Sequence, residues 1–324
     1  MSVVLTKSRC INTIKCYGNY ALSRLGLVRF THMPTFVSVE PASVCQLRCP
    51  ECPVGMKYGS KGGQKKEDPY MRRSVWVKVL EEIKPYAHTV QFYFQGEPLL
   101  HKELNRMIYE ANKYGLYTIV STNAQAMTEE LAMDLVGAGL DRIIISMDGL
   151  TDESYQAYRI GGSLEQCKKA ICYLREAKKN LESSIRIEIQ CLRLKTNEHE
   201  WKAFKQQYKS LGADRLVFKT AQLYNYAEGH PLMPSAPRYS RYRKGEDGLY
   251  HRKNLHRGCF RVWSGVVVTT TGEVLPCCYD KSHSYAYGNI MDKPLAELFS
   301  NEKARAFRMA AEQEKPQICQ ECWR

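Results

Sequence analysis

The sequence predicts an α/β fold, a partial (β/α)6 barrel followed by a small C-terminal domain built from a β-hairpin and a helix. Two observations lead to this prediction. From residue 36 onward, short apolar runs alternate with helical patterns, as parallel βα repeats do. Cysteines gather at two places, directly after the first apolar run and at the C-terminal end. A doubly wound sheet would give the same alternation and stays open as an alternative.

The apolar runs define six expected strands. Helical patterns fill the spaces between them; in one of these, Leu164, Cys167, Ile171 and Leu174 recur at helical spacing after Ser163, a typical N-cap residue. In a barrel of such units, functional groups collect at the C-terminal ends of the strands. The expected strands are Phe36 to Val39, Thr89 to Phe94, Tyr117 to Ser121, Arg142 to Ser146, Ile185 to Leu192 and Arg215 to Phe218.

Composition divides the chain into four segments. Residues 1–35 form a basic, helical N-terminal extension, 36–218 the barrel, 219–258 a basic connector or lid rich in Tyr and Pro, and 259–324 the C-terminal module. Three prolines between residues 231 and 237 argue against regular structure in the connector. The C-terminal module contains an expected hairpin of 266–270 and 273–277 and an expected helix from about 295 to 311. By itself this module is too small to bury much core, and bound metal would help to stabilise it.

The composition also limits the class of protein. Among the 324 residues there is no uninterrupted apolar run long enough to span a membrane, and no signal peptide is recognisable, so we expect a cytoplasmic protein. The net charge of +13 favours an anionic partner. Thirteen cysteines could form a disulfide scaffold, but such scaffolds are usually short and secreted, so thiolates that hold metal fit better.

The N-terminal extension has two interpretations. Five basic residues precede the first acid, Glu40, and apolar residues at Leu5, Ile11, Ile14, Leu22 and Leu25 suggest a broken amphipathic helix. Such a helix can rest peripherally on a membrane surface. More often an apolar stripe packs on its own domain, and we favour that interpretation. The five basic residues are Lys7, Arg9, Lys15, Arg24 and Arg29.

Three cysteines follow the first expected strand. Cys45, Cys49 and Cys52 form a C-x3-C-x2-C pattern. Three thiolates on one short loop can bind three irons of a 4Fe-4S cluster and leave the fourth iron without a protein ligand. A zinc site is the alternative.

This pattern resembles the main signature of the radical S-adenosylmethionine (radical SAM) superfamily. The resemblance implies that S-adenosylmethionine chelates the open iron through its amine and carboxylate and that the reduced cluster cleaves it to methionine and a 5′-deoxyadenosyl radical. The sequence departs from the family at Glu51, where an aromatic residue usually lies near the adenine. Further similarities at the strand ends imply cofactor contacts from Gly96, Glu97 and Pro98, from Ser121 and Asn123, and from Ser146 and Asp148. Lys195, Thr196 and Asn197 are weaker candidates, since helix capping explains Asn197 equally well.

The second cysteine set lies at the C-terminus. Cys259 and Cys277 flank the expected hairpin turn, and Cys319 and Cys322 end the chain. The arrangement is similar to the auxiliary-cluster domain called SPASM and, because it has fewer cysteines, to its shortened form, Twitch. The resemblance implies one auxiliary 4Fe-4S cluster with all four irons bound by protein. Cys278 could replace Cys277, and a zinc ribbon on the same four cysteines is the alternative.

The resemblance implies a radical SAM oxidoreductase that receives electrons from an external one-electron donor such as flavodoxin or ferredoxin. The net charge favours an anionic small molecule as substrate, to be oxidised or rearranged. A peptide or protein maturase, of the ribosomal-peptide or sulfatase-activating kind, is the first alternative, although the sequence shows no separate peptide-binding domain. A nucleic-acid-binding protein or a simple redox carrier would also use cysteine clusters. A nucleic-acid-binding protein, however, does not need six βα units. A redox carrier does not explain why the first cysteine set lacks a fourth cysteine for its cluster.

Overall fold

The computed structural model describes residues 4–27, 29–59, 69–253, 258–313, 315–320 and 322. Within them a nine-stranded sheet has the order β11-β10-β9-β1-β2-β3-β4-β5-β6. Strands β9 and β1 to β6 are parallel, while β10 and β11 are antiparallel to their neighbours. The barrel strands are β1 (Phe36–Val39), β2 (Thr89–Phe92), β3 (Tyr117–Thr122), β4 (Arg142–Ser146), β5 (Arg186–Arg193) and β6 (Arg215–Thr220).

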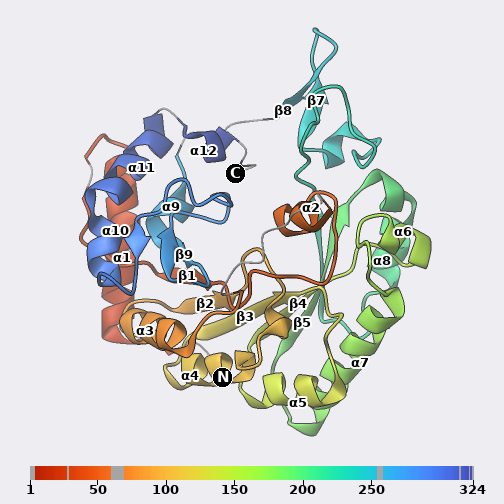
Figure 1. Ribbon diagram of the computed structural model, residues 1–324, viewed down its shortest axis with the longest axis horizontal. Coiled ribbons are helices and arrows are strands. Elements are labelled where there is room, and N and C mark those ends of the chain that lie inside the picture. The colour runs from red at the N-terminus through yellow and green to blue at the C-terminus, as the bar shows by residue number, and fades with distance from the viewer. Residues whose placement is uncertain are drawn as a thin grey trace.

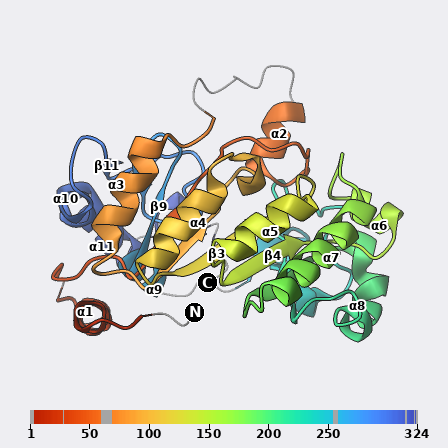
Figure 2. The same cartoon turned by 90° about the horizontal axis from the view of Figure 1, so that it is seen from below.

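Helices cover the outer face of this sheet (Figures 1 and 2). Their apolar residues recur every three or four positions, so one face packs on the strands; α3, for example, buries Val75, Val79 and Ile83. The side chains of Thr128, Thr151 and Ser163 cap the N-termini of three helices. The helices are α3 (Arg73–Ile83), α4 (Leu104–Lys113), α5 (Glu129–Gly137), α6 (Asp152–Gln156), α7 (Leu164–Asn180) and α8 (Trp201–Gln207), with 3-10 turns η1 (Pro98–Leu100) and η2 (Lys195–Glu200).

The expected partial barrel is confirmed. All six strands occur where the sequence predicts them, and no end differs from its expected position by more than two residues. Each strand from β1 to β6 neighbours the next along the chain. A doubly wound sheet would reverse its strand order at a switch point, so that alternative is excluded.

The C-terminal module is built into the barrel sheet. Its strand β9 (Gly265–Val268) pairs in parallel with β1, and β10 (Glu273–Leu275) and β11 (Gly288–Asn289) extend the sheet beyond it. The expected hairpin is therefore present, although its strands are shorter than predicted. The module does not bury a core by itself, as expected: Trp263, Val266 and Val268 belong to the same hydrophobic core as the barrel strands.

The expected C-terminal helix is interrupted. It consists of α10 (Leu295–Ser300) and α11 (Glu302–Gln313), separated by Asn301. The Asn301 side chain accepts a hydrogen bond from Ala304 N and donates one to Tyr287 O, so it caps α11 and fixes the break. Short helices α9 (Phe260–Ser264) and α12 (Gln317–Gln320) flank the module.

The connector between barrel and C-terminal module contains regular structure, contrary to expectation. Strands β7 (Tyr242–Lys244) and β8 (Tyr250–Arg252) form an antiparallel hairpin after the turn η3 (Pro237–Tyr239). Gly248, with φ +81°, provides the left-handed residue that the hairpin turn needs. Figure 1 shows the hairpin projecting from the rim of the barrel, above α2 (Pro53–Gly59).

A second hydrophobic cluster joins this connector to the first cysteine loop. Leu223, Leu232 and Tyr242 of the connector pack with Leu47 and Cys49. The connector is therefore not merely a solvated linker, because it shares a core with the loop that carries the cysteines.

Helix α1 (Lys7–Ser23) packs on its own domain, as the favoured interpretation of the N-terminal extension states, but not through its apolar stripe. Its buried side chains include Arg9, Asn12 and Asn19, whereas Ile11 and Ile14 are exposed. The apolar stripe therefore faces outward, and the polar face packs on the protein.

Candidate functional site

The three-cysteine loop follows β1 directly and is anchored on both sides. On one side Glu97 N donates to Val44 O at 2.8 Å, and on the other Arg48 N donates to Ile160 O at 3.0 Å. Leu47, which is 1% exposed, is the apolar anchor between them. These contacts hold the loop at the carboxyl ends of the strands, where the sequence predicts the site.

Two glycines allow backbone segments to approach this loop closely. A Cβ on Gly96 would lie 2.1 Å from Ala42 O, and a Cβ on Gly55 would lie 2.4 Å from Cys49 O. No other residue fits at these positions without a backbone shift. Gly96 therefore brings the end of β2 against the segment before the cysteines, and Gly55 seats α2 against Cys49.

The thiols of this loop lie in a buried environment with polar donors. Burial raises the pKa of Cys45 to about 12 and raises the pKa of Cys49 as well. Asn123 Nδ2 lies 3.3 Å from Cys45 Sγ, and Arg159 Nη1 lies 3.8 Å from Cys49 Sγ. Such donors favour the thiolate form, which is the form that binds metal.

Glu97 organises the ends of β2 and β3. Its carboxylate accepts hydrogen bonds from Leu99 N at 3.1 Å, Thr122 Oγ1 at 2.5 Å and Asn123 N at 2.8 Å. The side chain is almost completely buried, and burial raises its pKa, while these three donors lower it. Direct contact between Glu97 and the cofactor stays a prediction; its contacts within the protein give it a positioning role.

Asp148 is likewise engaged inside the protein. Its Oδ2 accepts from Arg159 Nε at 2.6 Å, and its Oδ1 accepts from Leu192 N at 2.6 Å. Burial lowers the pKa of Arg159, but Asp148 and Cys49 outweigh burial and raise it well above its usual value. Arg159 therefore remains a cation that connects the end of β4 to the first cysteine loop.

The other predicted cofactor contacts lie at the same edge of the sheet. Ser121 is half-buried near the end of β3, Ser146 is the last residue of β4, and Pro98 begins η1 after Glu97. Their contacts with a cofactor stay predictions. Asn197 instead behaves as a structural residue, since it bonds Leu194 N and the backbone oxygen of Asp148 while fully buried.

Glu51 connects the cysteine loop to the connector. Its Oε2 accepts from Tyr224 N at 2.5 Å, and its Oε1 lies 3.3 Å from His230 Nε2. The residue that departs from the family's aromatic pattern thus holds the connector over the loop. Sequence spacing gave no signal for this contact, because 173 residues separate Glu51 and Tyr224.

The C-terminal cysteines also come together. Burial raises the pKa of Cys277, and the neighbouring thiols of Cys278, Cys319 and Cys259 raise it further. Burial raises the pKa of Cys319 to about 12, and Cys259 and Cys322 contribute to this rise. Cys278 is exposed and lies near Tyr93. The choice of Cys277 over Cys278 as the fourth ligand, which the glycine spacing suggests, stays a prediction.

The number of thiols suits iron-sulfur clusters. Three thiols on the first loop could bind three irons of a 4Fe-4S cluster, and four at the C-terminus could bind all four irons of a second one. Within the described ranges, no group of three or more His, Cys, Asp or Glu side chains is placed to hold a single metal ion. The assignment of these cysteines as cluster ligands therefore stays a prediction, with a zinc site as the alternative.

Fold and site together define an iron-sulfur protein on a partial (β/α)6 barrel. Comparison with protein families agrees: residues 39–188 match the radical SAM superfamily, and residues 259–323 match SPASM, an iron-sulfur cluster-binding domain. The chain belongs to the radical SAM superfamily and carries a C-terminal SPASM domain. It is therefore an enzyme of radical chemistry that binds a 4Fe-4S cluster and S-adenosylmethionine in its first domain and auxiliary iron-sulfur in its second.

Several characterised relatives are similar over most of the chain. The tungsten-containing aldehyde ferredoxin oxidoreductase cofactor-modifying protein of Pyrococcus furiosus is 24% identical over 318 residues, covering 89% of this chain and 86% of that protein. The PqqA peptide cyclase of Rhizobium meliloti is 25% identical over 315 residues, covering 90% and 80%. The AdoMet-dependent heme synthase of Nitratidesulfovibrio vulgaris is 24% identical, covering 85% and 82%.

Solved structures share the fold. Streptococcus suis SuiB bound to S-adenosylmethionine superposes with a TM-score of 0.66 at 13% identity, covering 90% of this chain and 72% of that one. The anSMEcpe structure with bound AdoMet gives a TM-score of 0.64 at 19% identity, covering 89% and 84%. BtrN in complex with AdoMet and 2-DOIA gives a TM-score of 0.54 at 18% identity, covering 90% of this chain and 93% of that one.

Sequence reasoning missed several residues of the site. Arg159 lies in a turn before α7, Thr122 lies between the predicted contacts Ser121 and Asn123, and Glu51 stands out in the sequence only as a departure from the family pattern. Each acts through a long-range contact that no local pattern reveals.

In the part of the chain that the structure describes, no helix has the length and apolarity required to cross a membrane.

Proposed function

We propose that this protein is a radical SAM oxidoreductase that acts on an anionic small molecule bound between its two cysteine sets. One observation carries the proposal: Tyr224 of the connector contacts both sides. Its backbone N–H donates to Glu51 in the first cysteine loop, and its hydroxyl accepts from Lys281 Nζ at 3.1 Å, three residues after Cys278. In this proposal the substrate binds close to these residues.

Two cations of this region have neutral partners. Lys281 Nζ donates to Gln222 Oε1 and Tyr224 OH, while Arg241 donates to Thr220 and to Tyr279 OH at 2.9 Å. Among the described residues neither cation has a carboxylate within ion-pair distance, so each retains charge for an incoming anion. Gln95, next to Gly96 at the end of β2, donates to Lys281 O at 2.9 Å and joins this group to the cofactor motif.

The proposed chemistry needs both cofactor sites. When bound, the first cluster with S-adenosylmethionine supplies a radical that takes a hydrogen atom from an unactivated C–H bond, and the auxiliary cluster supplies an acceptor for the electron that a net oxidation removes. In this proposal Cys45, Cys49 and Cys52 hold the first cluster. Cys259, Cys277, Cys319 and Cys322 hold the auxiliary one. The strand-end residues predicted above position the cofactor.

The chain's own residues would hold the substrate and exclude water. Lys281 and Arg241 orient an anionic group, and the connector packs its apolar side chains on the cysteine loop, which limits solvent access to the space below. Arg159 keeps a positive charge beside Cys49, where negative charge accumulates on cluster binding.

A peptide substrate is the second candidate. The names of PqqA peptide cyclase and of a SuiB structure bound to the precursor peptide SuiA describe relatives and structural neighbours that act on or bind peptides. An acidic residue of a peptide could occupy the same cationic site. The proposed substrate class is therefore tested with both kinds of compound.

Anaerobic reconstitution with iron and sulfide tests the cofactor assignment. We expect about eight irons per chain for two clusters, whereas about four irons with one zinc would indicate a zinc ribbon at the C-terminus. With dithionite and S-adenosylmethionine, the protein should release 5′-deoxyadenosine. No release above that of Cys49→Ala would contradict the enzymatic assignment.

Substrate class is tested by release of 5′-deoxyadenosine in the presence of anionic small molecules or acidic peptides. Lys281→Gln should reduce the response to an anionic compound, whereas Lys293→Gln, an exposed lysine of the same module, should not. A response to peptides alone would favour the second candidate. An equal response of both variants to a small anion would contradict the role of Lys281.

A further inference from the structure

Helix α1 has an inverted amphipathic arrangement. Its buried residues recur every three or four positions, so they occupy one face, and all but one of them are polar: Arg9, Asn12, Cys16, Asn19 and Ser23. Soluble proteins usually place the apolar face of a helix against their core. Here the core side of the helix is polar, and a specific set of partners must hold it.

Those partners are mostly backbone carbonyls from distant segments. The Arg9 guanidinium, 1% exposed as a residue, donates to Lys84 O, Val4 O, Gly115 O and Tyr114 O at 2.5 to 3.2 Å. Asn12 donates to Met33 O and Tyr86 O and accepts from Met33 N. Rotation of the helix about its axis would leave a buried guanidinium without partners, so the orientation of α1 is fixed.

The outward face is consequently apolar. Within the described chain, seven of the seventeen large apolar side chains that are exposed fall between residues 4 and 27. Ile14 is 71% exposed and Tyr17 is 58% exposed. A concentration of this kind usually marks a surface that binds something. The seven residues are Val4, Leu5, Ile11, Ile14, Tyr17, Leu25 and Leu27.

Positive charge accompanies this apolar face. Lys7 and Lys15 are exposed on α1, and no acidic residue occurs before Glu40. Apolar residues flanked by lysines on the exposed side of one helix are typical of helices that lie in the headgroup region of a membrane.

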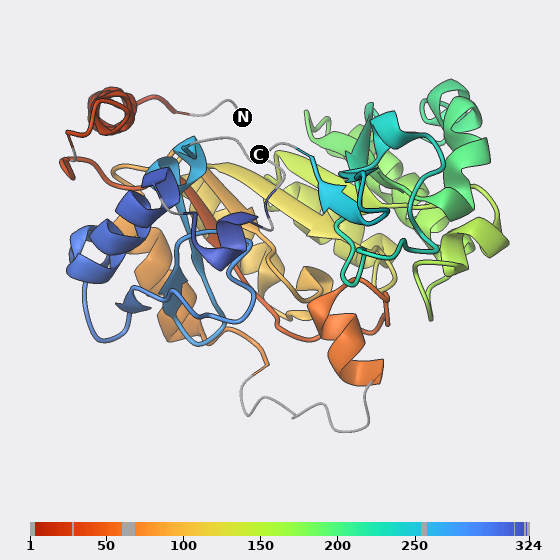
Figure 3. The same ribbon diagram turned by 90° about the horizontal axis from the view of Figure 1, so that it is seen from above.

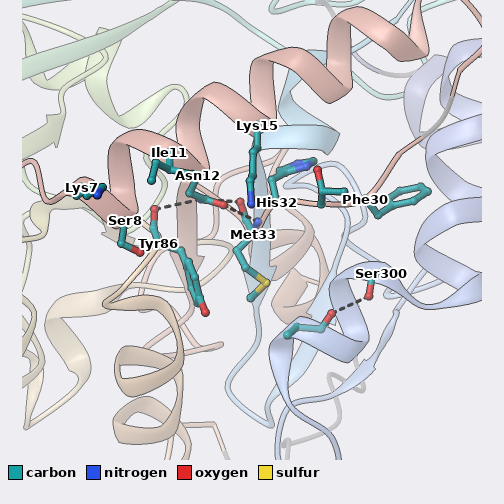
Figure 4. A pocket seen from close by; sticks show the side chains of 12 residues that line it. Lys7, Ser8, Ile11, Asn12, Lys15, Phe30, His32, Met33, Tyr86 and Ser300 are labelled. Atoms are coloured by element: carbon teal, nitrogen blue, oxygen red, sulfur yellow. Dashed lines mark hydrogen bonds between the residues drawn. The ribbon is translucent and has the colours of Figure 1, made fainter.

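A groove beside α1 adds a place for a headgroup. It has a volume of about 800 Å³ and lies between α1, the segment from Phe30 to Met33, and α10. Figure 4 shows Lys7, Lys15 and Ser300 around it, and the Ser8 hydroxyl lies at the same opening. Ammonium and hydroxyl groups around an open groove suit the phosphate of a lipid.

The position of α1 leaves its outer face accessible. Figures 2 and 3 both show the helix at the edge of the molecule, on the side away from α2 and the first cysteine loop. A flat surface that contacts α1 therefore leaves the barrel mouth uncovered.

We propose that α1 docks the protein on an anionic lipid surface. Ile14 and Leu25 enter the interface, while Lys7 and Lys15 bind phosphate headgroups; Tyr17 instead stacks on Phe260 of α9. An anionic lipid surface fits better than an acidic protein partner, because the apolar residues extend along the helix and beyond both its ends rather than form a compact patch.

Sedimentation with vesicles tests the apolar part of the proposal. The full, anaerobically reconstituted chain is mixed with phosphatidylcholine vesicles that contain phosphatidylglycerol, and separately with phosphatidylcholine alone. We expect binding to the anionic vesicles and about tenfold weaker binding by Ile14→Glu. Leu181→Glu, which alters an exposed apolar residue after the end of α7, should bind as the unchanged protein does. Equal binding by all three proteins, or no binding to anionic vesicles, overturns the proposal.

A second comparison tests the lysines. A double variant that carries Lys7→Gln and Lys15→Gln should bind vesicles more weakly, by about fivefold for each lysine removed. The difference should be larger at low salt, where charges are screened less. The pair Lys169→Gln with Lys179→Gln, exposed on α7, is the matched control and should have no effect. Undiminished binding by the Lys7 and Lys15 variant overturns the headgroup assignment.

Other occupants of the face give distinct results. If inorganic phosphate binds the groove while vesicles do not bind, the groove is a soluble-anion site and the proposal is wrong. If light scattering shows a dimer that Ile14→Glu converts to monomers, the face is a self-interface and the proposal is likewise wrong. Release of 5′-deoxyadenosine and the circular dichroism of Ile14→Glu should match the unchanged protein, since the side chain is exposed.

Discussion

Glu51 Oε1 lies 3.3 Å from His230 Nε2, while Oε2 of the same carboxylate accepts from Tyr224 N. One side chain between two cysteines therefore holds two points of the connector. The barrel mouth and the connector are therefore linked through this one carboxylate.

Replacing Glu51 should loosen the connector. In Glu51→Ala, Tyr224 N loses a charged acceptor that contributes about 1.5–3 kcal/mol, so its amide hydrogen should exchange about tenfold faster or more. Hydrogen–deuterium exchange of residues 222–232 measures this. Glu228→Gln, an exposed acid in the same segment, should leave exchange unchanged. Unaltered exchange in Glu51→Ala would show that the hydrophobic cluster alone holds the connector.

Breaking the pair of Arg159 and Asp148 should be costly. Arg159→Gln leaves a fully buried carboxylate without its cation, and we expect a loss of about 3–5 kcal/mol of stability. The urea midpoint of the reconstituted protein provides the measurement. Adding Asp148→Asn should recover part of the loss because the uncompensated charge disappears. Strictly additive losses of stability in the double variant would mean that the two side chains do not interact. Arg175→Gln, which alters an exposed arginine, serves as the control and should leave the urea midpoint unchanged.

Gly96→Ala should displace the end of β2. The added Cβ would lie 2.1 Å from Ala42 O, so the backbone must shift, and Glu97 moves with it. We expect a lower melting temperature and weaker retention of S-adenosylmethionine in equilibrium dialysis. Gly18→Ala is the matched control, because its Cβ would meet nothing within 4 Å and alanine favours the helix by up to about 1 kcal/mol. Normal retention in Gly96→Ala would contradict the tight approach.

Acid should weaken the attachment of α1 through His32. Burial lowers the pKa of His32 from 6.5 to about 4, while its hydrogen bond to Trp263 O opposes this shift and Arg308 adds to it. The unfolded chain therefore takes up a proton between these pH values that the folded chain does not. The free energy of unfolding should therefore fall by about 3 kcal/mol as the pH drops from about 6.5 to about 4. Above pH 6.5, His32 should not change it further.

The free energy of unfolding, measured at several pH values, tests the role of His32. His32→Gln should flatten the dependence, since no side chain then titrates at this position between Asn19 and Trp263. His199→Gln, whose ring is 68% exposed, should retain the full slope. An identical slope in His32→Gln would assign the acid sensitivity to another group.

Local patterns predicted the barrel well. β-branched and apolar runs such as Arg142–Ser146 were found at the expected residues, because a strand buried on both faces leaves a continuous apolar signal. The cysteine spacings and the Gly96-Glu97-Pro98 motif likewise identified the edge of the sheet where the site lies. These features depend on a few neighbouring residues, which a sequence displays directly.

Long-range relationships were not predictable in this way. The orientation of α1 depends on carbonyls near residues 84 and 115 that accept from Arg9, and amphipathic periodicity alone suggested the opposite face. The break at Asn301 depends on Tyr287 O, and the role of Glu51 on Tyr224. In each case a polar side chain has a partner that becomes visible only after folding.

The parallel pairing of β9 with β1 has a consequence for how the chain is made. Phe36–Val39 leaves the ribosome early, but Gly265–Val268, which covers its outer edge, follows more than two hundred residues later. Until then the nascent protein displays a bare strand edge, a template for aggregation. A product truncated before residue 265 would keep that edge permanently, so loss of the C-terminal segment should cause insolubility as well as loss of the auxiliary cysteines.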